Sequence, residues 1–240
     1  MNYKKLFSKK YAEKLEAARW HVTEFLEKVS RQIPPDSLVL DAGAGECWYR
    51  PLFKNQRYFS CDFGKGKKSW DYTDLDFYCD LSRISVKKDV FDAVIATQVL
   101  EHLSRPNDFL DEAYKILKPG GRLYVTVPFS GKIHQEPYDF YRYTHYGLEY
   151  LLKNAGFEVE SIIPHGGYFL CLGNMLIRCH RNLFPRKRRL ITKILTFLIE
   201  PFSKIFFTVI IPALSHHLDK LDKRKLDTLG YSCIAKKPAQ

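Results

Sequence analysis

Three acids and two glycines are spaced along the chain in a way that could hold a nucleoside. Asp41 closes the apolar run 38–40 and is followed by Gly43 and Gly45. A short apolar run of this kind is typical of a buried parallel strand. The two glycines let the backbone turn sharply and approach a ligand closely, because they carry no Cβ. We therefore expect the first strand and the ligand-binding turn of a nucleotide-binding α/β fold.

The next residues argue against a dinucleotide. A dinucleotide-binding turn carries a third glycine three residues after the second, and that position holds Trp48. Its bulky indole is incompatible with the close helix–strand packing that the third glycine allows. Binding of a pyrophosphate at this turn, and with it an NAD-dependent enzyme, is therefore disfavoured. Residues 47–53 are expected to open a helix whose first N–H groups are free.

Two further acids follow predicted strands. Asp62 ends the run 58–62 and lies 21 positions after Asp41. A carboxylate offers two acceptor oxygens, so Asp62 is placed to bind two ribose hydroxyls, although an ordinary turn aspartate is the alternative. Asp80 lies in the predicted third strand, residues 77–81, and its alternative role is the N-cap of the following turn.

The remaining pattern is that of alternating strands and helices. An amphipathic helix is predicted for residues 8–32, and Pro34 and Pro35 end it. Further strands are predicted at 90–97, 122–128, 157–163 and 229–236, with helices at 107–117 and 147–154 and a turn at 118–121. Asp92 begins the fourth strand, far from its carboxyl end, so we interpret it as a structural acid.

Several of these segments resemble one family in the same order. They are D-A-G-A-G-E at 41–46, F-D-A-V-I-A-T-Q-V-L-E-H-L at 91–103, I-L-K-P-G-G at 116–121 and R-L-Y-V-T-V-P at 122–128. Together they resemble class I S-adenosylmethionine-dependent methyltransferases of the type 11 group, which methylate small molecules and lipids. The resemblance covers residues 37–164 and the end of the chain. It implies a Rossmann-like α/β fold whose seven-stranded sheet has the order 3-2-1-4-5-7-6, an antiparallel last strand, and helices on both faces.

The resemblance also implies a cofactor and its binding residues. S-adenosylmethionine would be held by Asp41, Gly43, Gly45, Asp62, Asp80, Leu81 and Gln98. Asp62 would bind the ribose, and Asp80 would meet the adenine amino group beside backbone N–H groups. The methyl acceptor would then approach over the carboxyl ends of the fourth and fifth strands.

The segment 129–145 is the best candidate for catalysis. It is dense in aromatic, acidic and imidazole groups, and it resembles the H-x-x-P-Y-D-F-x-R-Y-T stretch of a bacterial methyltransferase group linked to surface-glycan or secondary-metabolite pathways. Because an imidazole titrates near neutral pH, His134 is the first candidate for a general base and His102 the second. An acceptor that is an amine or a carbon acid would need no strong base.

Tyr138 is the third catalytic candidate and also a substrate-binding one. The predicted acceptor-binding residues are Tyr138, Asp139, Tyr141 and Arg142. In the alternative interpretation the aromatic residues only fasten the loop, and Asp139 pairs with Arg142. The sequence shows no Cys/His cluster, so no metal is expected.

The chain is expected to fall into three parts. Residues 1–35 form a helix covering the sheet, residues 36–164 and 227–240 form the methyltransferase core, and residues 165–226 form a helical insertion. In the insertion a basic cluster, Arg178, Arg181 and 186–189, leads into the apolar stretch 190–214. Charged residues interrupt this stretch before it reaches the roughly 18 residues of a membrane-spanning helix. Two shorter helices broken at Pro201 are predicted.

Charge and cysteine content bear on partners. The net charge is +11 and its basic residues flank apolar helices, an arrangement typical of contact with an anionic membrane surface. A helical cap or a homodimer interface is the alternative. Nucleic acid is disfavoured, because no appended binding module and no basic groove with exposed aromatics is recognisable. Six scattered cysteines and no visible signal peptide predict reduced thiols in a cytoplasmic protein.

The sequence thus predicts transfer of a methyl group from S-adenosylmethionine to an oxygen of a small molecule, a sugar or a lipid-linked acceptor. Two alternatives remain open. One is a methyltransferase acting on RNA or another nucleic acid, and the other is a non-catalytic partner protein that keeps the fold.

Overall fold

The computed structural model describes residues 16–66, 69–184 and 196–239. The chain divides into two compact units. One comprises Val22–Ile163 with Gly230–Gln240, and the other comprises Met1–His21 with Pro164–Leu229. Each unit is described by itself.

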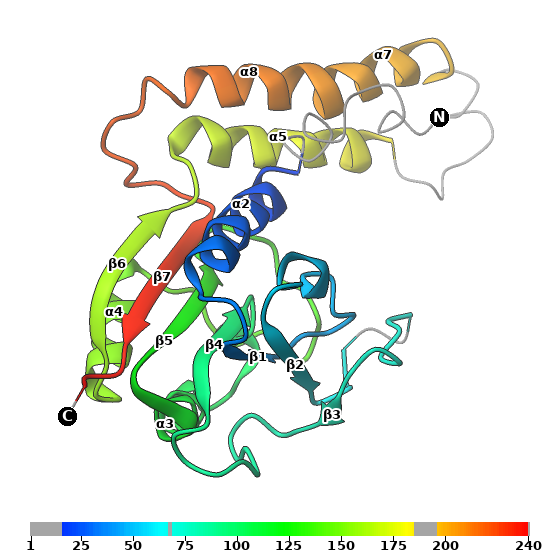
Figure 1. The fold of residues 1–240 in the computed structure, drawn as a ribbon. Coiled ribbons are helices and arrows are strands. Elements are labelled where there is room, and N and C mark those ends of the chain that lie inside the picture. Colours follow the sequence, from blue (N-terminus) through cyan, green and yellow to red (C-terminus); the bar gives the residue numbers. More distant parts are fainter. Residues whose placement is uncertain (1–15, 67–68, 185–195, 240) are drawn as a thin grey trace. The chain divides into compact units, whose positions relative to one another are not determined.

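The first unit is built on a seven-stranded sheet with the order β3-β2-β1-β4-β5-β7-β6 (Figure 1). Its strands are β1 (Leu38–Ala42), β2 (Arg57–Asp62), β3 (Phe77–Tyr78), β4 (Phe91–Thr97), β5 (Leu117–Pro128), β6 (Glu158–Pro164) and β7 (Gly230–Lys236). Strands β1 to β5 pair in parallel, whereas β7 pairs antiparallel with β5. The predicted Rossmann-like order and the antiparallel last strand are therefore confirmed.

Alternating side chains of the central strands enter two separate cores. Val39 and Ile95 face one core together with α2 (Ala17–Gln32), which contributes Leu26 and Val29. Leu40, Val94 and Ala96 face the opposite core, together with α3 (Pro106–Ile116) and α4 (His145–Asn154). Because successive strand residues point to opposite faces, an apolar run can be buried by helices on both sides. The prediction of helices on both faces is confirmed.

Three local predictions differ from the structure. The helix expected at 47–53 is reduced to a 3-10 turn, η2 (Arg50–Leu52). Cys47 has a φ of 53°, which is left-handed and interrupts any helical path at this point. The turn predicted at 118–121 is part of β5, whose register shifts against β4 between Phe91 and Ala93. The N-terminal helix begins at Ala17, and residues 8–15 of the prediction lie outside the described residues.

The second unit is helical. It contains α5 (Tyr168–Leu183) and a continuous run made of α7 (Ile199–Ile205), the π-helical turn η4 (Phe206–Ile210) and α8 (Ile211–Leu218). Pro201 lies in the first turn of α7, where its missing N–H has no helical partner, so a helix begins two residues before the predicted break. The wide turn η4 comes just before Pro212, which cannot donate to the preceding turn, and this explains the local π geometry.

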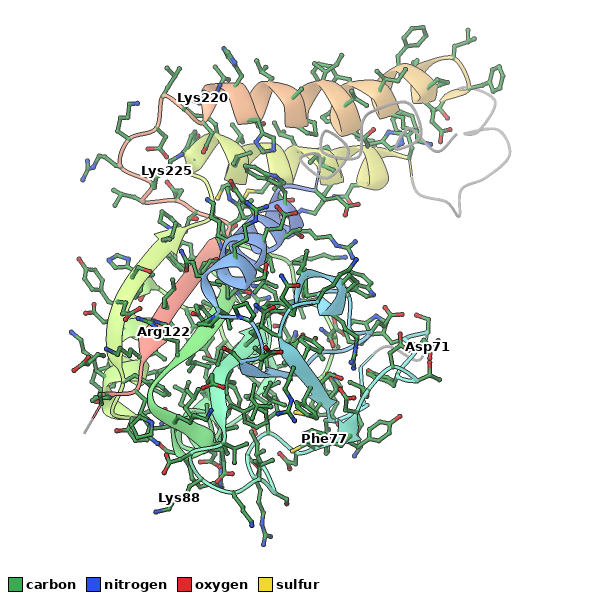
Figure 2. All side chains as sticks on the ribbon, in the orientation of Figure 1. Asp71, Phe77, Lys88, Arg122, Lys220 and Lys225 are labelled. Carbon is green, nitrogen blue, oxygen red and sulfur yellow. The ribbon has the colours of Figure 1, made fainter. Side chains whose placement is uncertain are left out.

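A buried aspartate fastens this unit. Asp219 accepts hydrogen bonds from the backbone N–H of Gly167, at 2.9 and 3.0 Å, and from that of Leu170 at 3.1 Å. Its carboxylate thereby satisfies free donors at the start of α5, and the ammonium of Lys225 neutralises it. Lys225 lies in the segment that follows α8 (Figure 2).

Within the described residues no helix is both long and apolar enough to cross a membrane. The basic residues 186–189 and the apolar residues 190–195 of the predicted insertion lie outside the described part of the chain.

Candidate active site

The turn after β1 is shaped by its two glycines. Gly43 and Gly45 have φ values of 82° and 54°, in the left-handed region that favours glycine. The N–H groups of Gly43 and Ala44 donate to the carbonyl of Cys61 at 2.8 and 3.0 Å, which ties the turn to β2. A Cβ on Gly43 would lie 2.5 Å from Val99 Cγ2. The backbone is thus held close to the segment after β4, with no room for a side chain.

Asp62 stands at the carboxyl end of β2, beside this turn. Its Oδ2 accepts the N–H of Gly45 at 3.0 Å and its Oδ1 accepts the N–H of Gly64 at 2.8 Å. Two backbone donors therefore fix the carboxylate, while each oxygen keeps a lone pair for a ligand hydroxyl. This geometry suits a ribose.

Asp80 closes the turn after β3. Its Oδ1 accepts the backbone N–H of Ser82 at 3.0 Å and the Ser82 hydroxyl at 2.8 Å. One carboxylate oxygen thus organises the turn, as in the predicted alternative role. Asp80, Leu81 and Ser82 all line the same cavity as the glycine turn.

Gln98 follows β4 in a left-handed conformation, with a φ of 55°. Such a backbone is uncommon for a residue with a side chain and is frequent at functional sites. The N–H of Gln98 donates to the carbonyl of Thr126 at 2.9 Å, and its side-chain amide contacts Thr126 Oγ1 at 3.3 Å. The turn after β4 is therefore fastened to β5, and it brings Gln98 to the cavity wall.

Asp41 lies apart from the cavity wall. Its side chain is buried, and its Oδ2 accepts a hydrogen bond from the hydroxyl of Tyr58. Burial raises the pKa of Asp41 from 3.8 to about 6, against the opposing effect of the Tyr58 hydroxyl. This carboxyl supports the strand that carries the glycine turn.

A single cavity of about 610 Å³ joins the residues considered above to the segment after β5. Gly43, Gly45, Asp62, Asp80, Leu81 and Gln98 line one part of it, and His102, His134, Gln135, Tyr138 and Phe140 line another. All three candidate catalytic residues are thus brought together with six of the seven candidate cofactor residues. Asp139, Tyr141 and Arg142 lie outside this wall.

Those three residues hold the loop in place. Arg142 donates to both carboxylate oxygens of Asp139, at 2.7 and 2.8 Å, and to the carbonyls of Lys132 and Tyr141. The Tyr141 hydroxyl donates to the carbonyl of Ser104 at 3.0 Å. Hydrogen bonds therefore hold the loop at these residues, and Asp139 pairs with Arg142 as in the predicted alternative.

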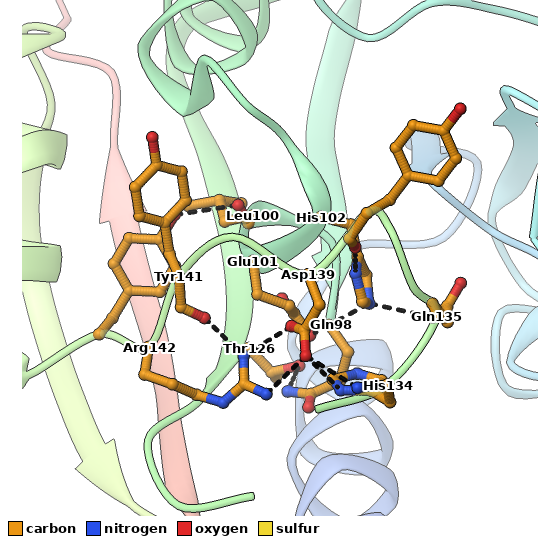
Figure 3. Close-up of polar contacts among 12 residues, drawn as sticks. Gln98, Leu100, Glu101, His102, Thr126, His134, Gln135, Asp139, Tyr141 and Arg142 are labelled. Carbon is orange, nitrogen blue, oxygen red and sulfur yellow. Dashed lines mark hydrogen bonds and ion pairs between the residues drawn. The ribbon is translucent and has the colours of Figure 1, made fainter. Parts of the chain in front are cut away.

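Asp139 also contacts His134, and Figure 3 shows its carboxylate between Arg142 and His134. The Oδ2 of Asp139 lies 3.3 Å from His134 Nδ1 and accepts the backbone N–H of His134 at 2.8 Å. The hydrogen bonds from Arg142 hold the pKa of Asp139 well below its usual range. An ionised Asp139 favours a proton on Nδ1 of His134, so Nε2 keeps its lone pair.

The tautomer of His102 is fixed by its neighbours too. Its Nδ1 lies against the carbonyl of Tyr138, which can only accept, so Nδ1 carries the proton. Its Nε2 is 2.9 Å from the side-chain nitrogen of Gln135 and 3.7 Å from Glu101 Oε1. Burial lowers the pKa of His102, which favours the neutral imidazole.

Glu101 was not singled out from the sequence. Its side chain is fully buried, and burial raises its pKa from 4.5 to about 8. Neither carboxylate oxygen has a hydrogen-bond partner among the described residues. Its backbone carbonyl accepts N–H groups of Phe140 and Tyr141, which pins the loop to the turn after β4. The sequence signal for Glu101 was a glutamate next to a histidine directly after an apolar strand. The burial of the Glu101 side chain, however, depends on the tertiary fold.

Residues 40–125 match the family model of a methyltransferase domain. These residues therefore carry a methyltransferase domain of the type 11 group, whose cofactor is S-adenosylmethionine. A protein of Mycolicibacterium smegmatis named as an S-adenosylmethionine-dependent methyltransferase is 29% identical over 137 residues, which span 52% of this chain and 53% of that protein. The mitochondrial ubiquinone biosynthesis O-methyltransferase of Mus musculus is 41% identical over 50 residues, which span 20% of this chain and 14% of that protein.

Solved structures agree with the methyltransferase domain in fold. An S-adenosylmethionine-dependent methyltransferase from Archaeoglobus fulgidus has a TM-score of 0.55 at 17% identity, over 90% of this chain and 94% of that one. The phosphoethanolamine N-methyltransferase 2 of Haemonchus contortus, in complex with S-adenosylmethionine, has a TM-score of 0.52 at 16% identity, over 92% of this chain and 53% of that one. The chain spans about half, or less, of the two curated relatives named above.

The residues of the methyltransferase domain fit the cofactor. The close approach of Gly43 to Val99 leaves the turn free of side chains, and Asp62 offers a fixed carboxylate at its edge. Asp80 and Leu81, which follow β3, line the same cavity. The cavity is large enough for a nucleoside with an attached amino acid, since ligand pockets span roughly 300–1,000 Å³.

Proposed function

We propose that this chain transfers the methyl group of S-adenosylmethionine to an oxygen atom of a small molecule, a sugar or a lipid-linked acceptor. The observation that supports this most is the single cavity shared by the cofactor residues and the two histidines. The sulfonium of the cofactor supplies an already activated methyl group. The protein must align the acceptor, exclude water and take the proton of a hydroxyl nucleophile.

His134 is the proposed general base. Asp139 holds Nδ1 of His134 at 3.3 Å, which leaves Nε2 as the proton acceptor. Nε2 of His102 is already engaged by the amide of Gln135, so His102 is less available for this role. In the proposed step the acceptor oxygen attacks the methyl carbon, the carbon–sulfur bond breaks, and the hydroxyl proton passes to His134 Nε2. The products are the methyl ether and S-adenosylhomocysteine.

The aromatic lining of the cavity suits an acceptor with a flat or apolar face. Trp48, Phe63, Tyr138 and Phe140 line it with side chains that are 45–53% exposed. Exposed aromatic rings of this kind contact sugar rings or apolar groups at little cost in desolvation. We therefore propose glycans and lipid-linked sugars as the first acceptors to screen.

The test uses S-adenosylmethionine labelled with ¹³C in the methyl group. The purified chain is incubated with panels of glycans, phenols and lipid-linked sugars, and the products are examined by NMR. We expect a labelled O-methyl resonance that is absent from the His134→Gln variant. Label found on nitrogen or carbon, or on RNA added as a separate panel, would contradict the proposed reaction.

We also propose that the helical unit contacts an anionic membrane surface. Phe202, Ile205 and Phe206 on α7 and η4 are 46–76% exposed, and Lys204 lies among them. An amphipathic helix with apolar side chains beside basic ones is typical of an interfacial contact. A membrane location would bring the site to lipid-linked acceptors.

Sedimentation with vesicles tests this contact. The full chain should pellet with phosphatidylglycerol-containing vesicles and remain in solution with pure phosphatidylcholine. Phe202→Ser should abolish pelleting, whereas Leu226→Ser, an exposed leucine outside the helices, should not. Failure of the wild-type chain to pellet with anionic vesicles would overturn the membrane proposal.

A further inference from the structure

We propose that Glu101, His102 and His134 form a binding site for a divalent transition-metal ion such as Zn²⁺. His102 and His134 line the cavity and Glu101 lies buried next to His102; the three come from the turn after β4 and the loop after β5. It contradicts the expectation from the sequence, where no cluster of metal ligands was visible. Binding of the ion needs neither cofactor nor acceptor, so it stands apart from the proposed methyl transfer.

The three side chains already converge. Each offers one ligand atom, and these atoms all lie within 4.8 Å of one another. Glu101 Oε1 is 3.7 Å from His102 Nε2, and the two imidazole rings meet edge to face with centroids 4.8 Å apart. Bonds from Zn²⁺ to nitrogen and oxygen of roughly 2.0–2.2 Å place ligand atoms roughly 3.3 Å apart. A closure of up to roughly 1.5 Å therefore completes the site.

Both imidazoles have the supporting contacts that metal-binding histidines show. The ring nitrogen of His102 opposite the site donates to the carbonyl of Tyr138. Nδ1 of His134 faces Asp139, which Arg142 holds in place. A ligating histidine almost always donates its other N–H to a carbonyl or a carboxylate, which fixes the tautomer and raises the basicity of the ligating nitrogen. Tyr138 supplies a carbonyl for His102, and Asp139 supplies a carboxylate 3.3 Å from Nδ1 of His134.

Glu101 gives an independent reason to place a cation here. Its side chain has no exposed surface, and both its oxygens lack a hydrogen-bond partner in the described part of the chain. A buried carboxyl without partners is costly, because it loses its hydration and gains nothing in return. A cation bound to Glu101 would satisfy these oxygens, and Figure 3 shows the carboxylate directed toward His102.

The ligand types select the ion. Two imidazoles and one carboxylate suit Zn²⁺ and other late first-row ions, whereas Mg²⁺ and Ca²⁺ prefer sites made of oxygen atoms alone. Three protein ligands leave a further coordination position open, as in zinc sites that bind a water or a substrate atom, and two of the three ligands line the cavity. The amide of Gln135, now 2.9 Å from His102 Nε2, must move aside when the ion binds.

Calorimetric titration of ZnCl₂ into the chelator-treated full chain tests the site without any methyl transfer. We expect one site per chain in the wild type. Glu101→Gln and His134→Gln should weaken it by more than about tenfold, because loss of a supporting residue alone weakens metal sites roughly 10–100-fold. His217→Gln replaces an exposed histidine of the helical unit and should leave the affinity unchanged.

Two controls keep the outcome clear. Thermal unfolding must show that each variant is folded. If Glu101→Gln does not fold, His134→Gln still tests the site, because His134 lies in a loop at the surface of the first unit. Co²⁺ in place of Zn²⁺ should give visible absorption bands without intense thiolate charge-transfer bands. No binding by the wild type, equal binding by both ligand variants, or thiolate bands from the free cysteines would each overturn the proposal.

Discussion

Nδ1 of His134 lies 3.3 Å from Oδ2 of Asp139, and the same carboxylate is held by two hydrogen bonds from Arg142. Because Arg142 keeps Asp139 ionised, the contact fixes both the orientation and the tautomer of the imidazole. A base prepared in this way directs its free Nε2 lone pair toward a reacting hydroxyl. The arrangement gives His134 a definite place in the proposed reaction.

His134→Gln should remove the base and keep the binding of cofactor. We expect kcat to fall by about 10²–10⁴, the usual contribution of a positioned general base. The affinity for S-adenosylhomocysteine, measured by calorimetry, should stay within about twofold, because none of the candidate cofactor residues changes. An equal loss of cofactor affinity and of kcat would assign His134 a structural role instead.

The ion pair of Asp139 with Arg142 should contribute far more to stability than a surface pair. The Asp139 side chain is 2% exposed, so Arg142→Met would strand a buried charge, at a cost of about 3 kcal/mol. Arg122→Met is the matched control. The side chains of Arg122 and Glu160 are 43% and 35% exposed, so their ion pair should contribute less than about 1 kcal/mol to stability. Arg122 lies on β5 (Figure 2).

Urea unfolding followed by circular dichroism measures both changes in free energy. Similar losses in Arg142→Met and Arg122→Met would show that the loop is not held as its contacts indicate. In that case the orientation of His134 by Asp139 would lose its support as well.

Asp41 should make the stability of the chain depend on pH. Its pKa in the folded chain is raised from 3.8 to about 6, so between these values the folded state keeps a proton that the unfolded state has lost. The free energy of unfolding should therefore fall as pH rises from about 4 to about 6, by up to about 3 kcal/mol from this group. Asp41→Asn cannot ionise and should lose this part of the pH dependence.

Unfolding curves of the wild type and of Asp41→Asn across this pH range isolate the contribution, since all other groups are shared. Asp111→Asn, at an exposed position of α3, should follow the wild type. Parallel curves for wild type and Asp41→Asn would contradict the raised pKa.

Zn²⁺ should inhibit the proposed methyl transfer. An ion bound to His134 occupies the lone pair that the base needs, so the rate should fall as the site fills and return when a chelator is added. The rate is followed by the release of S-adenosylhomocysteine at several concentrations of ZnCl₂. A higher rate in the presence of Zn²⁺ would contradict the role of His134 as base and assign activation of the acceptor to the ion.

The framework of the fold could be predicted because its signals are local. The apolar run before Asp41, the glycine pair and the strands around Val94 and Val125 each carry their own pattern, and their order follows the family. The 3-10 turn at Arg50 and the start of α7 two residues before Pro201 could not be predicted in the same way. Both depend on where a proline or a left-handed residue falls within the turn, which the sequence pattern does not reveal.

The site was predictable in part for the same reason. Acids and glycines at strand ends share one edge of a parallel sheet, so Asp62, Gln98 and His134 could be expected to meet. The burial of Glu101 and the separation of Asp41 from the cavity arise from packing between segments distant in sequence. The spacing of residues in the sequence does not reveal such packing, although it determines the environment of Glu101 and Asp41.

Titration of S-adenosylhomocysteine into the purified chain tests the central claim most directly. The wild type should bind with micromolar affinity, and Asp62→Asn should bind about 10–100-fold more weakly, since hydrogen bonds to a charged group contribute about 1.5–3 kcal/mol. Asp111→Asn should match the wild type. Failure of the folded wild-type chain to bind, or equal affinity in Asp62→Asn, would contradict the account of the cofactor site.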